Sequence, residues 1–232
     1  MTVKCVWEHN GDDTLLYAEN FIGAYTRGAN LEIARSKMPD EIRSYLKWID
    51  KSVSCEIDID IVQEKASALN ICDADSDVIF DSERAPLTSE EYSRCKELCL
   101  KSARDFLALF DSIENKDKSA LQSRQTFYGV IPRTAREMYE HTKNVNSYYF
   151  GEIGVDADND GNICLCRERG FAALEAKDGF LSEAPVSGSY DEMWSLKKVL
   201  RRFLWHDRIH AKAMYRMALK TFGAGVKNIF CF

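Results

Sequence analysis

Residues 203–219 read FLWHDRIHAKAMYRMAL and carry two of the four histidines of the chain, His206 and His210. Apolar residues recur around this pair at steps of three and four, which is typical of a helix packed in a bundle. We therefore predict a long helix over about residues 190–222, with both histidines on its buried side. Its expected inward row is Leu196, Val199, Phe203, His206, His210, Ala213 and Met217.

The same periodicity predicts another long helix after residue 86. Thr88 and Glu91 have the spacing of a capping box, in which each side chain bonds to the other residue's backbone N–H. Ser189 and Glu192 repeat this spacing and would open the last helix. The expected inner row of the helix after Thr88 is Tyr92, Cys95, Cys99, Ser102, Phe106, Leu109 and Ile113.

A second long helix is expected from Pro132 to about Gly151, because proline suits the first turn of a helix. A shorter helical stretch, RERGFAALEAK, follows at 167–177. The expected inner row of the second long helix is Met138, His141, Val145 and Tyr148. Three of the four histidines are thus expected to point into one helical core.

The first 82 residues have a different sequence pattern, in which short stretches of alternating apolar and polar residues are separated by turns. VKCVWEH and TLLYAEN are strand-like around the turn NGDD, and VSCEIDIDIV and SDVIFDS predict two more strands. NLEIARSK and DEIRSYLKWID predict two helices separated by Met38–Pro39. The predicted fold class is therefore two-domain: a small α+β module over 1–85, followed by an all-α up-and-down four-helix bundle over 86–232.

The composition of the 232 residues narrows the class of protein. Hydrophobic residues make up 45% and charged residues 29%, and no apolar run approaches the roughly 20 residues of a membrane helix. The chain has a net charge of −6 and so lacks the excess of basic residues that is typical of nucleic-acid-binding proteins. The eight cysteines, with no secretory signal pattern before them, predict reduced thiols in a cytoplasmic protein. We expect no nucleic acid and no membrane as partners.

Three imidazoles that converge in an apolar core need partners for up to six ring nitrogens. A divalent ion takes one nitrogen from each ring and leaves the other free to donate a hydrogen bond. Three protein ligands also leave coordination positions open for water or substrate, as in catalytic metal sites. We predict a metal site formed by His141, His206 and His210. The alternative is a buried histidine network without metal.

The helical half resembles the DinB-like superfamily of four-helix bundles. FLWHDRIHAKAMYRMAL is similar to the last-helix motif of that superfamily, and EMYEHTKNVNSYYFGEIG is similar to its second-helix segment, over about residues 88–222 in all. The resemblance implies that His141, His206 and His210 hold a divalent ion, such as zinc, nickel or iron. Many members follow the second histidine with Arg-Gly-Gln, where this chain has AKAM. Bundles of this superfamily often pair, which predicts a homodimer.

The first part of the chain resembles HicB-like domains, which have strands, a glycine-containing turn and then a helix. The resemblance covers about residues 3–62 and includes LLYAENFIGAYTRGANLEIARSKMPDEIRSYLKW. HicB-like domains are known as antitoxin modules and as a degraded RNase-H-like fold. The acidic cluster that a nuclease needs is missing here, so we expect a binding or packing role.

Two functions are compatible with these features. The first is a metal-dependent transferase or isomerase that uses a low-molecular-weight thiol as cosubstrate and acts on a small molecule, as the DinB-like resemblance implies. The metal would bind the thiol as thiolate, and its three ligands would not act as bases. The second is a non-catalytic, antitoxin-like or stress-related protein whose N-terminal module captures a protein partner.

Three other motifs are interpreted as structural. DADNDGNI at 156–163 imitates a calcium loop, but Arg167 stands where the loop needs a bidentate glutamate, so we predict a polar turn. Cys95 and Cys99 are expected in the core, although thiolates could also face the metal. A basic row along the last helix is expected to be a solvated face, with an anion-attracting approach to the metal pocket as the alternative; it comprises Arg201, Arg208, Lys212 and Arg216.

Overall fold

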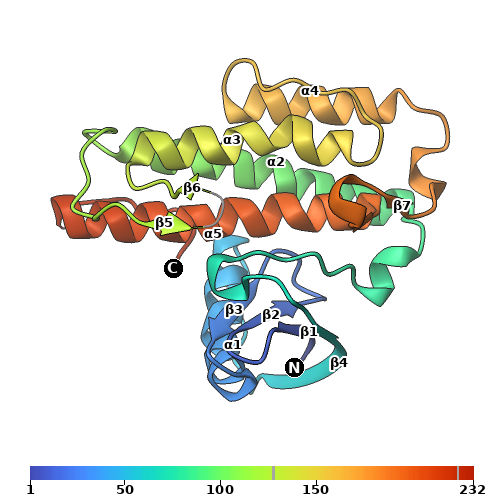
Figure 1. The fold of residues 1–232 in the computed structure, drawn as a ribbon, viewed down its shortest axis with the longest axis horizontal. Helices are drawn as coiled ribbons and strands as arrows, with labels where there is room; N and C mark the ends of the chain where they lie inside the picture. The colour runs from blue at the N-terminus through green and yellow to red at the C-terminus, as the bar shows by residue number, and fades with distance from the viewer. Residues whose placement is uncertain (127–128, 224) are drawn as a thin grey trace.

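A computed structural model describes residues 1–126, 129–223 and 225–232 (Figure 1). The first part of the chain forms a four-stranded sheet and one helix. In chain order its elements are β1 (Thr2–His9), β2 (Thr14–Ala18), β3 (Tyr25–Gly28), α1 (Leu31–Trp48) and β4 (Asp58–Ala66). The strand order is β3-β2-β1-β4, and β4 pairs with β1 in parallel while the other pairs are antiparallel.

Both faces of this sheet are covered, so β2 is buried along its whole length. Leu16 and Ala18 belong to the same hydrophobic cluster as Met38 of α1. Leu15 and Tyr17, which alternate with them, lie in a second cluster that also includes Trp205. Successive side chains of a strand point to opposite faces. One face of the sheet therefore meets α1 and the other meets the last helix.

Three local predictions in this part are wrong. The chain forms one helix through Pro39, where we predicted two helices. Ala34, Met38 and Ile42 bury one face of α1 and so hold the helix together. Pro39 has no N–H for the carbonyl of Arg35, but Arg35 is exposed, so water can hydrate that carbonyl. The strand predicted at 53–62 runs from Asp58 to Ala66.

The segment 76–82, predicted as a strand, has no ladder. Its backbone carbonyls accept instead from side chains, as the carbonyl of Asp77 does from Lys198 and that of Val78 from Arg201. The side chains of Val78 and Phe80 are buried in the second hydrophobic cluster. An apolar run can thus be buried without joining the sheet when charged side chains satisfy its backbone.

The rest of the chain is mainly helical. Its helices are α2 (Ser89–Ser112), α3 (Ala135–Gly151), α4 (Ile163–Glu175) and α5 (Leu196–Phe222), joined by two small hairpins, β5 (Gln125–Thr126) with β6 (Gly129–Val130) and β7 (Val186–Ser187) with β8 (Met193–Trp194). The Thr88–Glu91 capping box is confirmed, and six of the seven residues of the predicted inner row of α2 are buried, with Cys95 half-buried.

The last helix begins later than predicted. Ser189 and Glu192 do not open it, because the chain turns at Tyr190 and Asp191 with positive φ and then pairs as β8. Ser195 caps the helix by accepting from the N–H of Lys198. Glu192 is used in an ion pair, with its carboxylate 2.8 Å from Nζ of Lys198.

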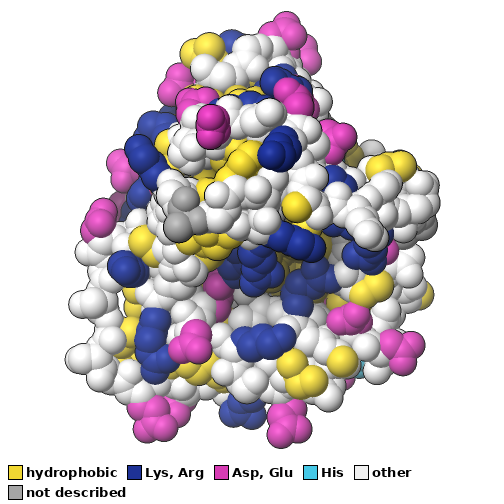
Figure 2. Space-filling model, turned by 90° about the vertical axis from the view of Figure 1, so that its left-hand side faces the viewer, with side chains coloured by type: hydrophobic (Ala, Val, Ile, Leu, Met, Phe, Trp, Pro, Cys, Tyr) yellow, Lys and Arg dark blue, Asp and Glu magenta, His cyan; other side chains and the backbone are white. Residues whose placement is uncertain are grey.

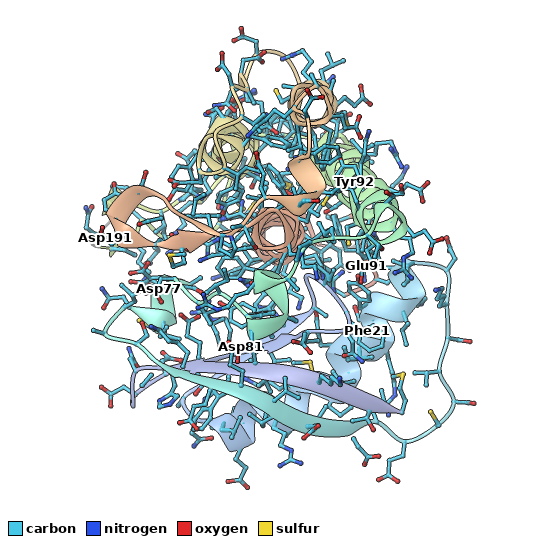
Figure 3. The ribbon with its side chains drawn as sticks, turned by 90° about the vertical axis from the view of Figure 1, so that its right-hand side faces the viewer. Phe21, Asp77, Asp81, Glu91, Tyr92 and Asp191 are labelled. Atoms are coloured by element: carbon cyan, nitrogen blue, oxygen red, sulfur yellow. The ribbon has the colours of Figure 1, made fainter. Side chains whose placement is uncertain are left out.

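Helix α5 lies in the middle of the molecule, with α2 and α3 on one side and the N-terminal sheet on the other (Figures 1 and 3). The solvated face predicted for its basic row is therefore wrong for Arg201 and Arg208, which are buried, and for the half-buried Lys212. Only Arg216 of that row is exposed.

Each buried charge of α5 meets a partner on another element. Arg201 pairs with Glu83, Lys198 with Glu192, and Asp207 with Arg167 of α4, where one nitrogen–oxygen distance is 3.2 Å. Arg208 and Lys212 share Glu41 of α1, with 2.8 Å between Arg208 and that carboxylate. These ion pairs tie α5 to four separate segments.

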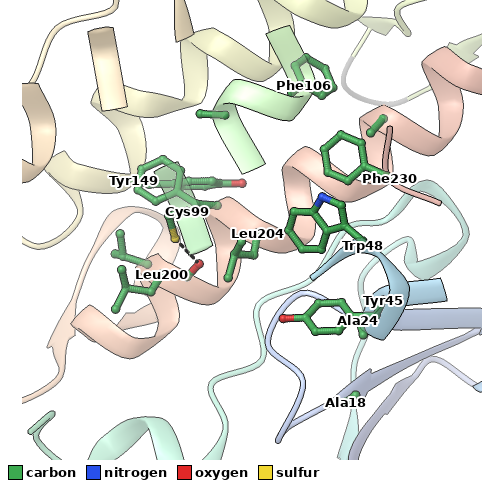
Figure 4. Close-up of a cluster of buried hydrophobic side chains, with 14 of the residues drawn as sticks. Ala18, Ala24, Tyr45, Trp48, Cys99, Phe106, Tyr149, Leu200, Leu204 and Phe230 are labelled. Carbon is green, nitrogen blue, oxygen red and sulfur yellow. Dashed lines mark hydrogen bonds between the residues drawn. The ribbon is translucent and has the colours of Figure 1, made fainter. Parts of the chain in front are cut away.

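The hydrophobic interior is continuous between the two parts of the chain. Trp48 of α1 stacks on Phe230 near the last residue, with 5.2 Å between ring centroids, and both lie in the cluster that includes Phe106 and Leu204 (Figure 4). The structure is thus mixed α+β, with a small N-terminal sheet and a helical remainder. The domain boundary at residue 85 stays a prediction. Among the described residues, no helix is long and apolar enough to cross a membrane.

We predict that Gly23→Ala destabilises the protein more than Gly11→Ala. Both glycines have φ near +95°, but a Cβ on Gly23 would lie 2.7 Å from Cβ of Leu204, whereas nothing lies within 4 Å of a Cβ on Gly11. The strained backbone is common to both variants, and the clash with α5 adds about 1–3 kcal/mol for Gly23 alone. Urea unfolding of the two variants measures the difference. Equal losses would contradict the close packing of the sheet on α5.

We also predict that Glu41→Gln costs about 3–5 kcal/mol at pH 7, because it leaves the buried Arg208 without its carboxylate. Burial raises the pKa of Glu41, but Arg208 and Lys212 outweigh it, and the net pKa is lowered. The unfolded carboxyl thus takes up its proton at a higher pH than the folded one. Stability supplied by Glu41 is present above the unfolded pKa of about 4.5 and is lost as the pH falls through the lower folded value.

Chemical denaturation from pH 7 to pH 3 tests this, and the gap between wild type and Glu41→Gln should narrow below about pH 4.5. The matched control is Asp40→Asn, one residue away, because Asp40 is exposed and pairs within its own helix. It should change stability by about 0.5 kcal/mol or less. A control loss as large as that of Glu41→Gln would contradict the role of the buried pair.

Candidate metal centre

The three predicted histidines lie together between α3 and α5. His206 and His210 are one turn apart on α5, so both rings face the same side of that helix. His141 approaches from α3, and its Nε2 is 3.3 Å from Nε2 of His206. One nitrogen from each ring can be chosen so that all three lie within 4.8 Å of one another.

The inner row predicted for α3 is correct at Met138, which is buried, and displaced by one position from His141 onward, although this histidine reaches the cluster. Thr142, Asn146 and Tyr149 are buried, whereas His141 and Tyr148 are exposed and Val145 is half-buried. Asn146 faces inward because its amide donates to the carbonyls of Asp158 and Cys166, so polar residues occupy this row. His141 therefore stands at the solvent edge of the cluster and His206 at its buried end.

The nitrogen separations suit a small divalent ion. Two ligands about 2.1 Å from a tetrahedral zinc lie about 3.4 Å apart, close to the 3.3 Å between His141 and His206. The three nitrogens lie within 4.8 Å of one another, which is wider than this ideal spacing, so binding requires a modest inward rotation of at least one ring. In addition, Nδ1 of His206 is buried without a hydrogen-bond partner among the described residues. The donor set and its spacing thus fit a metal.

Burial keeps these imidazoles neutral, which is the form that binds metal. Burial lowers the pKa of His141, and it lowers the pKa of His210 to about 3 with a further contribution from His141. The pKa of His206 falls well below 6.5, through burial first and then through the other two histidines, Arg202 and Arg167. A metal ion would therefore displace few protons near neutral pH.

The surroundings of the cluster combine aromatic rings with positive charge. The ring of Tyr149 meets that of His206 edge-on, with 5.9 Å between centroids. Arg167 stacks on Phe203 at 3.7 Å, and its charge is balanced by Asp207. Arg202 lies one helical turn before His206 and also contacts the ring of Tyr149. The cations oppose binding of a cation, so affinity for metal has to come from the three nitrogens.

Sequence reasoning missed Arg202, Tyr149 and the Arg167–Asp207 pair as neighbours of the site. Neither Arg202 nor Asp207 belongs to the inward row predicted for the last helix. The available signal was the step of four residues from Arg202 to His206 to His210. That signal is weak, because charged residues at this spacing are common on exposed helices.

The other candidate sites are used structurally. In the calcium-like tract, Asp158 pairs with Arg169, Asn162 caps α4, and Arg167 is buried against Asp207. That this tract is a polar turn without tight calcium binding stays a prediction. Cys99 is buried and donates to the carbonyl of Leu200 (Figure 4), and all eight cysteines are free. Cys95 and Cys99 are not among the side chains that form the metal-binding group.

Positive charge also gathers elsewhere on the surface. Figure 2 shows Lys and Arg side chains in a hollow between the helical part and the sheet. This gathering is local, because the chain as a whole has a net charge of −6.

A comparison of the chain with protein-family models, with curated proteins and with solved structures found no match.

We predict that His206→Ala lowers the metal content of protein purified without added metal or a His-tag. Wild-type protein should gain thermal stability when zinc is added, since an ion that binds only the native state stabilises it by RT ln(1 + [L]/Kd). The variant should lose most of this gain. His9→Ala is the matched control, because His9 lies on β1 outside the cluster. Elemental analysis and melting curves measure both effects, and unchanged wild-type melting with chelator would favour the histidine network without metal.

Proposed function

We propose that this protein binds one divalent metal ion through His141, His206 and His210 and belongs to the DinB-like type of four-helix bundle. The observation that carries the proposal is the convergence of three imidazoles from two helices, all within 4.8 Å. The contacts of α2 and α3 with both α4 and α5 support the bundle. Zinc, nickel and iron are the candidate ions, because imidazole suits each of them.

The proposed activity is that of a metal-dependent transferase or isomerase with a low-molecular-weight thiol as cosubstrate. Three protein ligands leave at least one coordination position free, and the exposed His141 lies at the solvent edge of the cluster. A bound ion supplies Lewis acidity that lowers the pKa of a thiol and holds it as thiolate. The histidines act as ligands and not as bases, while Tyr149 and the other buried aromatic rings exclude water from the inner side.

The N-terminal module is proposed to serve a packing role. The order of three strands, a glycine at Gly28 and then one continuous helix agrees with the HicB-like resemblance. Its outer face offers little to a protein partner: among the described residues 1–82, the exposed large hydrophobic side chains are Ile33 and Val62. The face against α5, by contrast, buries Trp205. A cytoplasmic location and a homodimer belong to the same proposal.

The thiol proposal is testable with cobalt as a spectroscopic substitute for the native ion. Adding 2-mercaptoethanol to cobalt-loaded protein should produce a thiolate-to-cobalt charge-transfer band in the near ultraviolet. The matched probe is 2-(methylthio)ethanol, a thioether that cannot ionise and should give no band. The band should be absent in His206→Ala. Cobalt-loaded protein that gives the same spectrum with both probes would refute thiol binding and leave the metal site standing.

A further inference from the structure

Arg202 differs from the buried cations of α5, and from the half-buried Lys212, in having no carboxylate partner. The half-buried Lys197 also forms no ion pair among the described residues and donates to the carbonyl of Ser82. Lys198, Arg201, Arg208 and Lys212 each form an ion pair with a glutamate. Among the described residues, Arg202 forms none, and its one hydrogen bond to a protein group goes from Nη1 to the carbonyl of Ser76. Glu192 and Glu8 act on its charge from beyond ion-pairing distance. A half-buried cation without a directly bonded counter-charge is costly and uncommon.

Unpartnered N–H groups gather around this guanidinium. Nε of Arg202 is buried without an acceptor, and so are the indole nitrogens of Trp194 and Trp205. Both indole rings contact the guanidinium, at 5.6 Å and 5.0 Å from its central carbon. Unpartnered nitrogens also occur on Arg167, Arg201 and Arg208, each of which has a carboxylate, and on Arg133, which forms no ion pair among the described residues. What distinguishes Arg202 is that three N–H donors without an acceptor belong to one group of contacting side chains.

The guanidinium is connected to the candidate metal centre through one ring. Tyr149 contacts the central carbon of Arg202 at 5.6 Å and the ring of His206 at 5.9 Å. Arg202 also precedes His206 by four residues on α5, which places both on the same side of the helix. A divalent ion at the histidines would add positive charge beside an arginine that forms no ion pair among the described residues.

Taken together, we infer that the molecule entering this site carries a carboxylate or a comparable small oxyanion, which Arg202 binds beside the metal. The inference rests on the proposed metal centre. A guanidinium presents paired N–H donors that match a carboxylate, and such charge-assisted bonds are about twice as strong as neutral ones. Trp194, Trp205 and Tyr149 are buried against the guanidinium, so the anion would have to reach Arg202 from its half-buried side. The substrate class is thus a small organic anion.

Benzoate and benzamide form a matched pair of probes, since they share a ring and differ in charge. Binding is followed by tryptophan fluorescence, to which Trp194 and Trp205 contribute, and by the visible spectrum of cobalt-loaded protein. Wild type should bind benzoate at least about ten-fold more tightly than benzamide, the effect of roughly one charge-assisted hydrogen bond. Arg202→Gln should abolish this preference, and Arg202→Lys, which keeps the charge, should retain part of it.

The control variant is Arg216→Gln, an exposed arginine on the same helix, which should leave the preference unchanged. Equal affinity of wild type for the two probes, or an unchanged preference in a folded Arg202→Gln, would overturn the inference. The metal proposal is tested independently of this preference, and it fails if cobalt does not bind to the protein. Benzoate binding to metal-free protein that still needs Arg202 would then support the anion site alone.

Discussion

The burial of α5 between the other helices and the N-terminal sheet is the constraint on which the rest of the structure depends. This helix contains lysines, arginines and an aspartate at positions that face into the protein. A buried charge is tolerated only with a close counter-charge, so each of these positions requires an acid or base on the element that it meets. Glu41 on α1, Glu83 before α2, Arg167 on α4 and Glu192 before α5 supply them. The pairing holds the sheet module and the other helices in one orientation around α5.

The candidate metal centre benefits from the same arrangement. His206 and His210 lie on a helix that is held on both sides, while His141 lies at the solvent edge of α3. The metal ligands on α5 are therefore held in place by packing, whereas the side of the cluster at His141 is open to solvent. Such a site can hold an ion with little rearrangement and still admit a small molecule, which is the arrangement that catalytic metal sites need.

Arg202 is notable because the buried cations near it on α5 form ion pairs and it does not. On an exposed helix an arginine without a carboxylate would need no explanation, because water screens its charge. The fully buried cations of this helix are all paired. A half-buried guanidinium that forms no ion pair and lies beside three imidazoles is therefore the basis for the inferred ligand-binding group. The aromatic rings around it stabilise the cation in part. They do not accept the hydrogen bonds that its N–H groups can donate.

The sequence by itself determined the helices that bury one face and the three histidines that come together. The inner row of α2 and its capping box were predictable because the periodicity and the cap are local. Tertiary structure decided the rest: that α1 continues through Pro39, that 76–82 is not a strand, that α3 is rotated by one position, and that α5 is buried on its charged side. The apolar periodicity of a helix sequence indicates only its apolar buried face. The charged face of α5 is buried because the N-terminal module, distant in sequence, carries the matching carboxylates and aromatic rings.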